Sequence, residues 1–195
     1  VLIVGDAGVG KRTLVSAFLA GVPKDEAIII RTSTRVGTAL TPFGVIADLA
    51  RDVLGLAEGA EPHEVQRRME RALPLIFAGE EHGREARGAM IALGLLLGVR
   101  PPGGEDIDPE ERRQRIFQLV LRVEQRLASD KPLLVVGEDV HWCDQESLEL
   151  FLELLRMPSG RPILGVVTSR PDRRVLDAAR VAGAEIVHRD EPEPE

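Results

Sequence analysis

Cysteine is almost absent from this chain of 195 residues, in which Cys143 has no second cysteine to pair with. An internal disulfide is therefore excluded, and a cytosolic setting is favoured. Basic residues are also outnumbered, because the chain has 25 Lys and Arg residues and 32 Asp and Glu residues, which gives a net charge of −7. A nucleic-acid surface needs a basic face, so we expect no direct nucleic-acid binding by this domain.

The sequence begins without an initiator methionine and shows neither a signal peptide nor a transmembrane run. Its longest apolar stretch, around 90–99, is about half of the roughly 20 residues that a span requires, so no membrane contact is expected. A strand is predicted from Val1 itself, and we interpret the chain as a piece of a longer protein, truncated at both ends. Residues 1–189 are predicted to form one domain, and the acidic, proline-rich tail at 190–195 a frayed linker.

Strand and helix patterns alternate along much of the chain. Short apolar runs predict strands at 1–4, 27–30, 133–136, 163–167 and 184–187. Apolar residues at helical spacing predict helices at 11–20, 42–56, 62–77, 85–97, 109–128, 145–156 and 172–181. Asp108 and Asp144 are expected to cap the helices that follow them. This alternation predicts an α/β fold, a parallel sheet of about five strands between helices, with the middle helices as an inserted segment.

A glycine-rich turn joins the first predicted strand to the first predicted helix. Its residues match the pattern G-x-x-x-x-G-K and read Gly5-Asp6-Ala7-Gly8-Val9-Gly10-Lys11. Glycines let successive backbone N–H groups point inward at phosphate oxygens, and the N-terminus of the helix adds positive potential. Lys11 would reach the β- and γ-phosphates of a nucleotide, whereas Asp6 is best explained as a turn former. The pattern therefore predicts a phosphate-binding loop.

The residue after this lysine departs from the usual pattern. A Ser or Thr normally stands there and holds Mg²⁺ through its hydroxyl, but here the residue is Arg12, followed by Thr13. One residue turns a helical side chain by about 100°, so it is left open whether Thr13 serves as the metal ligand. The Arg12 side chain is expected either to extend into solvent or to lie along the phosphates and partly replace the charge of the metal. Phosphate binding should survive this change, and metal-dependent hydrolysis is placed in doubt.

Two carboxylates, Glu138 and Asp139, follow the apolar run of the third predicted strand. We expect this strand to run beside the first one, which would bring its end next to the phosphates. One carboxylate would hold Mg²⁺, and the other would orient or deprotonate the attacking water. We assign Glu138 to the metal and Asp139 to the water, although the roles could be exchanged. The alternative is that both are solvated acids in a loop.

Polar residues also end the fourth predicted strand, in the segment Thr168-Ser169-Arg170. A polar side chain there could touch the γ-phosphate or the attacking water, and Arg170 could neutralise phosphate charge. The alternative for Arg170 is an ion pair with a surface acid. His141 and Trp142, close behind the acidic pair, are interpreted as packing and hydrogen-bonding residues.

Together these segments resemble the AAA-like ATPase domain of the STAND class of signalling NTPases. The string from Gly137 to Asp144, which contains Glu-Asp-x-His-Trp-x-Asp, is the most specific of them. Ser147-Leu148, Thr168 to Pro171 and Thr41-Pro42-Phe43 also fit, so the resemblance covers nearly the whole chain. It implies the strand order 5-1-4-3-2. It is strongest to domains of large bacterial regulators that carry adenylate cyclase, protein kinase or LuxR-type DNA-binding domains.

The resemblance implies a domain that holds ATP or ADP as a switch, turns over slowly and uses Mg²⁺. Its expected partners are the nucleotide and other domains of the same chain, which could be sensor, kinase, cyclase or DNA-binding domains. Nucleotide-dependent self-association is a further expectation. The alternative is a nucleotide-binding regulatory module without hydrolysis, which Arg12 suggests. A metabolic kinase is a third hypothesis, but the sequence shows no acceptor motif.

Overall fold

Five parallel strands form one sheet in the unit made of Val1–Val45 and Leu127–Glu195. The computed structural model describes residues 1–23, 25–34, 41–57, 59–76, 83–99, 107–129, 131–156 and 162–189. The predicted tail at 190–195 and the predicted helix end at Phe77 lie outside these residues. The strands are β1 (Leu2–Val4), β2 (Ile28–Ser33), β3 (Leu133–Glu138), β4 (Ile163–Ser169) and β5 (Ile186–His188).

The strand order is β2-β3-β4-β1-β5, which confirms the predicted order read from its other end. The expectation that the acidic strand runs beside the loop strand is wrong, because β4 lies between β1 and β3. Val167 of β4 pairs with Leu2 of β1 on one side and with Gly137 of β3 on the other. The run Gly165 to Ser169 is buried throughout, as a central strand requires.

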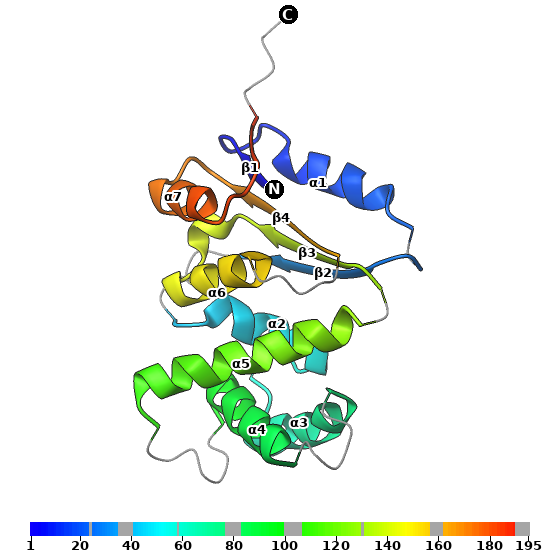
Figure 1. Cartoon of the computed structure of the whole chain (residues 1–195), viewed down its shortest axis with the longest axis vertical. Helices are drawn as coiled ribbons and strands as arrows, with labels where there is room; N and C mark the ends of the chain where they lie inside the picture. The colour runs from blue at the N-terminus through cyan, green and yellow to red at the C-terminus, as the bar shows by residue number, and fades with distance from the viewer. Residues whose placement is uncertain are drawn as a thin grey trace, which may run out of the picture. The chain divides into compact units, whose positions relative to one another are not determined.

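Helices cover both faces of this sheet (Figure 1). One face packs against α1 (Lys11–Ala20) through a cluster that contains Ile3, Val15, Leu134, Val136 and Val166. The other face packs against α6 (Gln145–Arg156) and α7 (Arg173–Val181) through a cluster that includes Leu2, Leu148, Val167, Val175 and Ala179. The alternation of Leu2, Ile3 and Val4 between the two clusters follows from the period of two along a strand.

Three strands extend two or three residues beyond their apolar runs. β2 ends at Ser33, β3 at Glu138 and β4 at Ser169, and Ser33 still pairs with Glu138. Backbone pairing continues there although the side chains become polar, which is why apolar patterning alone predicts strands that are too short. These polar ends all lie at the carboxyl edge of the sheet, where parallel α/β proteins hold ligands.

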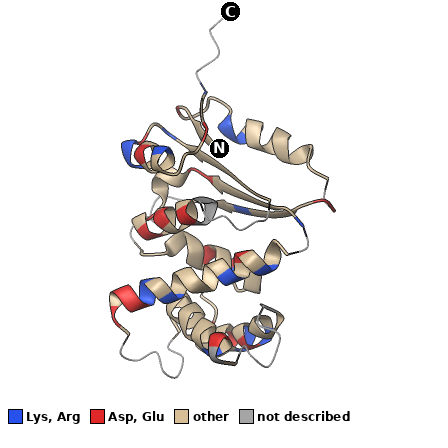
Figure 2. Cartoon of the chain, viewed as in Figure 1, with Lys and Arg blue, Asp and Glu red and all other residues tan. Residues whose placement is uncertain are grey.

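The second unit, Ile46–Arg126, is helical. Its helices are α2 (Gly44–Leu54, which begins in the first unit), α3 (Pro62–Ile76), α4 (Gly83–Leu97) and α5 (Pro109–Leu127). Asp108 caps α5, as predicted, by accepting the N–H groups of Glu110 and Glu111 at 2.9 Å. Acidic and basic positions share α5 (Figure 2), where Arg115 pairs with Glu111 at 2.6 Å and Arg122 pairs with Glu85 of α4 at 2.8 Å.

Candidate functional site

The glycine-rich turn lies between the end of β1 and the start of α1, as predicted. Gly8 and Gly10 adopt left-handed φ values of 90° and 87°, and Gly10 is the N-cap residue of α1. Glycine adopts this conformation without the steric cost that other residues meet. The turn therefore delivers the chain into α1 with the N-terminus of the helix, which favours anions, at the carboxyl edge of the sheet.

Lys11 crosses back over this loop. Its Nζ donates hydrogen bonds to the carbonyl oxygens of Gly5 and Asp6, both at 2.7 Å, and the residue is 8% exposed. Two of the three ammonium donors are thus used, and the third has no partner among the described residues. The remaining loop residues Asp6, Ala7 and Gly8 are exposed, and Val9 is buried.

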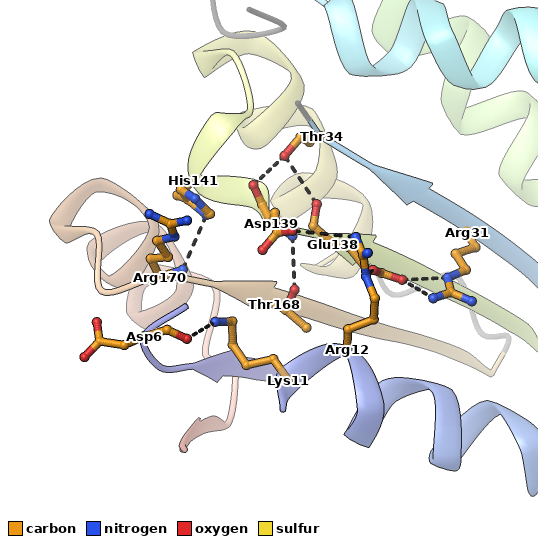
Figure 3. Close-up of polar contacts among 10 residues, drawn as sticks. All are labelled: Asp6, Lys11, Arg12, Arg31, Thr34, Glu138, Asp139, His141, Thr168 and Arg170. Carbon is orange, nitrogen blue, oxygen red and sulfur yellow. Dashed lines mark hydrogen bonds and ion pairs between the residues drawn. The ribbon is translucent and has the colours of Figure 1, made fainter. Parts of the chain in front are cut away.

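Arg12 points toward the end of β3 (Figure 3). Its Nε donates to Oε2 of Glu138 at 2.7 Å, and its Nη2 lies 3.9 Å from Oδ2 of Asp139. The hydrogen bond and the charge of Glu138 raise the pKa of Arg12 above its ordinary value. The side chain is neither extended freely into solvent nor detached from the acidic pair, because it links the first turn of α1 to the end of β3.

Glu138 is shared with a second arginine that the sequence analysis did not single out. The Nε of Arg31, on β2, donates to Oε1 of Glu138 at 2.6 Å, and Nη2 of Arg31 also contacts that oxygen. The Glu138 side chain is 3% exposed. Each of its oxygens therefore faces a guanidinium group, which compensates for its removal from water.

Asp139 has a left-handed backbone conformation, with φ 58° and ψ 39°. Its N–H donates to Oγ1 of Thr168 at 3.0 Å, and its carbonyl oxygen accepts a hydrogen bond from the hydroxyl of Thr34. The side chain is 38% exposed, in contrast to the buried carboxylate of Glu138. The backbone bonds fix this residue at the turn after β3 while its carboxylate stays accessible to water.

The end of β4 supports this turn. Thr168 and Ser169 are buried, at 2% and 0% exposure, and the hydroxyl of Ser169 donates to the carbonyl oxygen of Arg170 at 2.7 Å. Arg170 is exposed and forms no ion pair with an acid in the described ranges, and its N–H donates to Nδ1 of His141 at 3.4 Å. Burial lowers the pKa of His141, which favours the neutral ring that can accept this bond.

Arg189, which follows β5, is a loop contact that sequence reasoning missed. Its N–H donates to the carbonyl oxygen of Val4 at 2.7 Å, and its Nε donates to that of Val9 at 3.3 Å. A side chain at Gly5 would place its Cβ 2.4 Å from the Arg189 carbonyl oxygen. Glycine at position 5 is therefore required by this close approach. No short motif marks residue 189, because only the pairing of β5 with β1 brings it here.

The fold and this loop define the class of P-loop nucleotide-binding proteins. The family described as the AAA ATPase domain matches residues 1–166, so the chain belongs to the AAA ATPase domain family. Membership of this family identifies a nucleotide-binding domain of the ATPase type. An uncharacterized protein of Rhizobium meliloti (strain 1021) is 29% identical over an alignment of 183 residues, and the match covers 92% of this chain and 17% of that protein.

Mg²⁺, which ATPases of this family typically use, fits these residues poorly. Both oxygens of Glu138 are engaged by arginines, and Arg12 stands where a metal-binding hydroxyl is usual. Thr13 is exposed and, within the described ranges, makes no hydrogen bond to Glu138 or Asp139. The described residues contain no group of three or more His, Cys, Asp or Glu side chains that could hold a metal, so any Mg²⁺ here would depend on the nucleotide for ligands. No described helix is long and apolar enough to span a membrane.

Proposed function

We propose that this chain binds ATP and ADP, hydrolyses ATP slowly, and passes its nucleotide state to attached domains of the same protein. The observation that carries the proposal is the arrangement of Lys11 and Asp139 at one edge of the sheet (Figure 3). Lys11 supplies a cation for the terminal phosphates, and Asp139 supplies an accessible carboxylate for water. Neutralisation of phosphate charge and activation of the attacking water both lower the barrier to phosphoryl transfer.

The binding step rests on the loop. Its backbone N–H groups and the N-terminus of α1 would hold the β- and γ-phosphates, with Lys11 as a point charge. Arg170, exposed at the end of β4, would neutralise further phosphate charge. The neutral ring of His141 holds the backbone of Arg170 and so orients the turn that carries it.

In the proposed reaction a water oxygen attacks the γ-phosphorus. The bond from that phosphorus to the oxygen bridging the β-phosphate breaks, and ADP leaves with the electron pair. The proton of the water passes to the carboxylate of Asp139. Turnover is expected to be slow because the second carboxylate, on Glu138, is occupied by Arg12 and Arg31 and cannot assist.

The switch role is supported by domain context. The matched part of the Rhizobium meliloti protein is 17% of its length, so the related domain there belongs to a much longer chain. The attached domains, the STAND class, a role in signal transduction or transcription regulation, and nucleotide-dependent self-association are all parts of this proposal. Binding without hydrolysis is the alternative, and membership of an ATPase family favours hydrolysis over it.

The test is calorimetric titration with ATP, ADP and GTP, followed by measurement of phosphate release. Lys11→Ala is expected to weaken ATP binding by about tenfold or more, because one charged hydrogen-bond donor to the phosphates is lost. Lys131→Ala, at an exposed lysine before β3, is the matched control and should bind as the parent does. If Lys11→Ala bound ATP as tightly as the parent, the assignment of the loop would be wrong.

A further inference from the structure

We propose that Arg12 and Arg31, held together by Glu138, replace the metal ion at the nucleotide phosphates. On this proposal, which rests on the proposed nucleotide binding, the chain binds ATP as the free anion and gains little affinity from Mg²⁺. Glu138 then anchors the two arginines and is a positioning residue rather than a metal ligand.

The geometry of the three side chains is the first observation that supports this proposal. Arg12 comes from the first turn of α1, directly after Lys11, and Arg31 comes from β2. Glu138, 2% exposed at the end of β3, accepts from Arg12 through Oε2 and from Arg31 through Oε1. One buried carboxylate thus holds two guanidinium groups from separate elements, with Arg12 next to Lys11 and Arg31 on the β2 side of Glu138 (Figure 3).

The charge around Glu138 is the second observation that supports it. Arg12, Arg31 and Glu138 together carry one net positive charge, and Asp139, whose Oδ2 lies 3.9 Å from Nη2 of Arg12, brings the group to neutrality. Without the two arginines, Glu138 and Asp139 would present two negative charges. A divalent cation approaching this carboxylate would meet two guanidinium groups at hydrogen-bonding distance and be repelled. Mg²⁺ also requires nearly octahedral oxygen ligands, and both oxygens of this carboxylate are already engaged by guanidinium groups.

The two arginines also remain accessible to a ligand. The Arg12 side chain is 68% exposed and that of Arg31 45% exposed, although both are anchored. A guanidinium group has five N–H donors, and the planar fork suits phosphate oxygens. Arg12 uses its Nε on Glu138, and its Nη2 lies 3.9 Å from Asp139, beyond hydrogen-bonding distance, so donors of its two terminal nitrogens remain for a phosphate. Because Glu138 already fixes the orientation of both arginine side chains, they lose less conformational freedom when phosphate binds.

The test compares ATP dissociation constants in excess Mg²⁺ and in EDTA, by calorimetry on the chain and its variants. For the parent, the two values are expected to agree within about threefold, since the charge of the metal is already supplied. Arg12→Ser removes that charge and restores a hydroxyl. It should weaken ATP binding in EDTA by about tenfold or more, and Mg²⁺ should recover most of the loss.

Further variants separate the roles. Arg12→Gln removes the charge without a metal-binding hydroxyl, so ATP binding should weaken in EDTA with little recovery by Mg²⁺. Arg31→Gln should also weaken binding in EDTA. Glu138→Gln should leave the ratio of the two constants close to one, because no metal is lost. Arg122→Gln breaks an exposed Arg–Glu pair of the helical unit, at 2.8 Å, and is the matched control.

The outcomes distinguish this inference from the proposed function. If the parent bound ATP tenfold or more weakly in EDTA than in Mg²⁺, the inference would be overturned and the proposed function would stand. The same would follow if Mg²⁺ strengthened ATP binding by the parent but not by Glu138→Gln. Unchanged ATP affinity in Arg12→Ser and Arg12→Gln would show that Arg12 is only a structural ion pair. Failure of the parent to bind ATP under both conditions would overturn the proposed function and, with it, the inference.

Discussion

Oδ1 of Asp144 accepts a hydrogen bond from the backbone N–H of Phe43 at 2.8 Å, across 101 positions of the sequence. The same oxygen accepts the N–H of Ser147 at 2.8 Å and so caps α6, as the sequence predicts. Asp144 is 2% exposed, and Phe43 has a left-handed φ of 58°. One buried carboxylate therefore fixes the start of α6 and the segment that leads into α2.

Asp144→Ala should lower the free energy of unfolding by about 2–3 kcal/mol, because it leaves two buried N–H groups without their acceptor. Asp172→Ala is the matched control. Asp172 caps α7 through one bond, to the N–H of Val175 at 3.2 Å, so about 1 kcal/mol is expected there. Urea denaturation of both variants checks this, and equal losses would show that the bond to Phe43 contributes nothing.

Asp139→Asn should abolish most phosphate release and leave ATP binding within about twofold of the parent. The amide cannot take the proton of the attacking water, whereas asparagine tolerates the left-handed conformation at φ 58°, so the turn should persist. Asp177→Asn, on the exposed face of α7, controls for the loss of an acid. Turnover that stays at the parent rate in Asp139→Asn would assign this residue a purely structural role.

Arg189→Ala should weaken ATP binding by about three- to tenfold, because the loop loses its side-chain bond to the carbonyl of Val9. Binding of ATP measured by calorimetry provides the check. Arg180→Ala, an exposed arginine of α7, should have no effect. Equal affinities for the Arg189 variant and the parent would mean that the backbone bonds of residue 189 hold the loop without help from its side chain.

The sequence predicted much of the fold because its signals are local. Glycines at fixed spacing, a lysine and capping aspartates mark the loop and the helix starts, and the structure confirms the turn at Gly10 and the caps at Asp108 and Asp144. The strand ends were predicted too early, since Glu138 and Ser169 are polar yet remain within strands β3 and β4. A pattern of apolar residues indicates which side chains are buried, whereas backbone pairing between strands can continue into polar residues.

The site was predicted less completely because its contacts are distant in sequence. Arg31 and Glu138 are 107 positions apart, and nothing around Arg31 distinguishes it from any other arginine. Arg12 was recognised as unusual from the motif alone, but its partner Glu138 lies on β3, which the strand order places two strands away from β1. The placement of Arg189 similarly depends on β5 pairing with β1. Sequence patterns identify unusual residues, and strand order decides which of them meet.

The last prediction concerns Cys143, which is 4% exposed. Burial, with the nearby charge of Asp144 as a smaller cause, raises the pKa of its thiol to about 12 from an ordinary value of 9.0. The folded state therefore favours the protonated thiol. The protonated thiol therefore contributes to the free energy of unfolding. This contribution is fully present below pH 9.0 and is lost as the pH rises toward about 12, because the unfolded chain releases the thiol proton at a lower pH than the folded chain does.

We expect the free energy of unfolding of the parent to fall across this range more steeply than that of Cys143→Ala, by at most about 1.4 kcal/mol per pH unit. The chain suits this test because it has no tyrosine and few lysines, so few other groups titrate there. Urea denaturation between about pH 8 and pH 11 measures the two slopes. Parallel slopes for parent and variant would mean that the folded thiol ionises as readily as the unfolded one, which its burial beside Asp144 argues against.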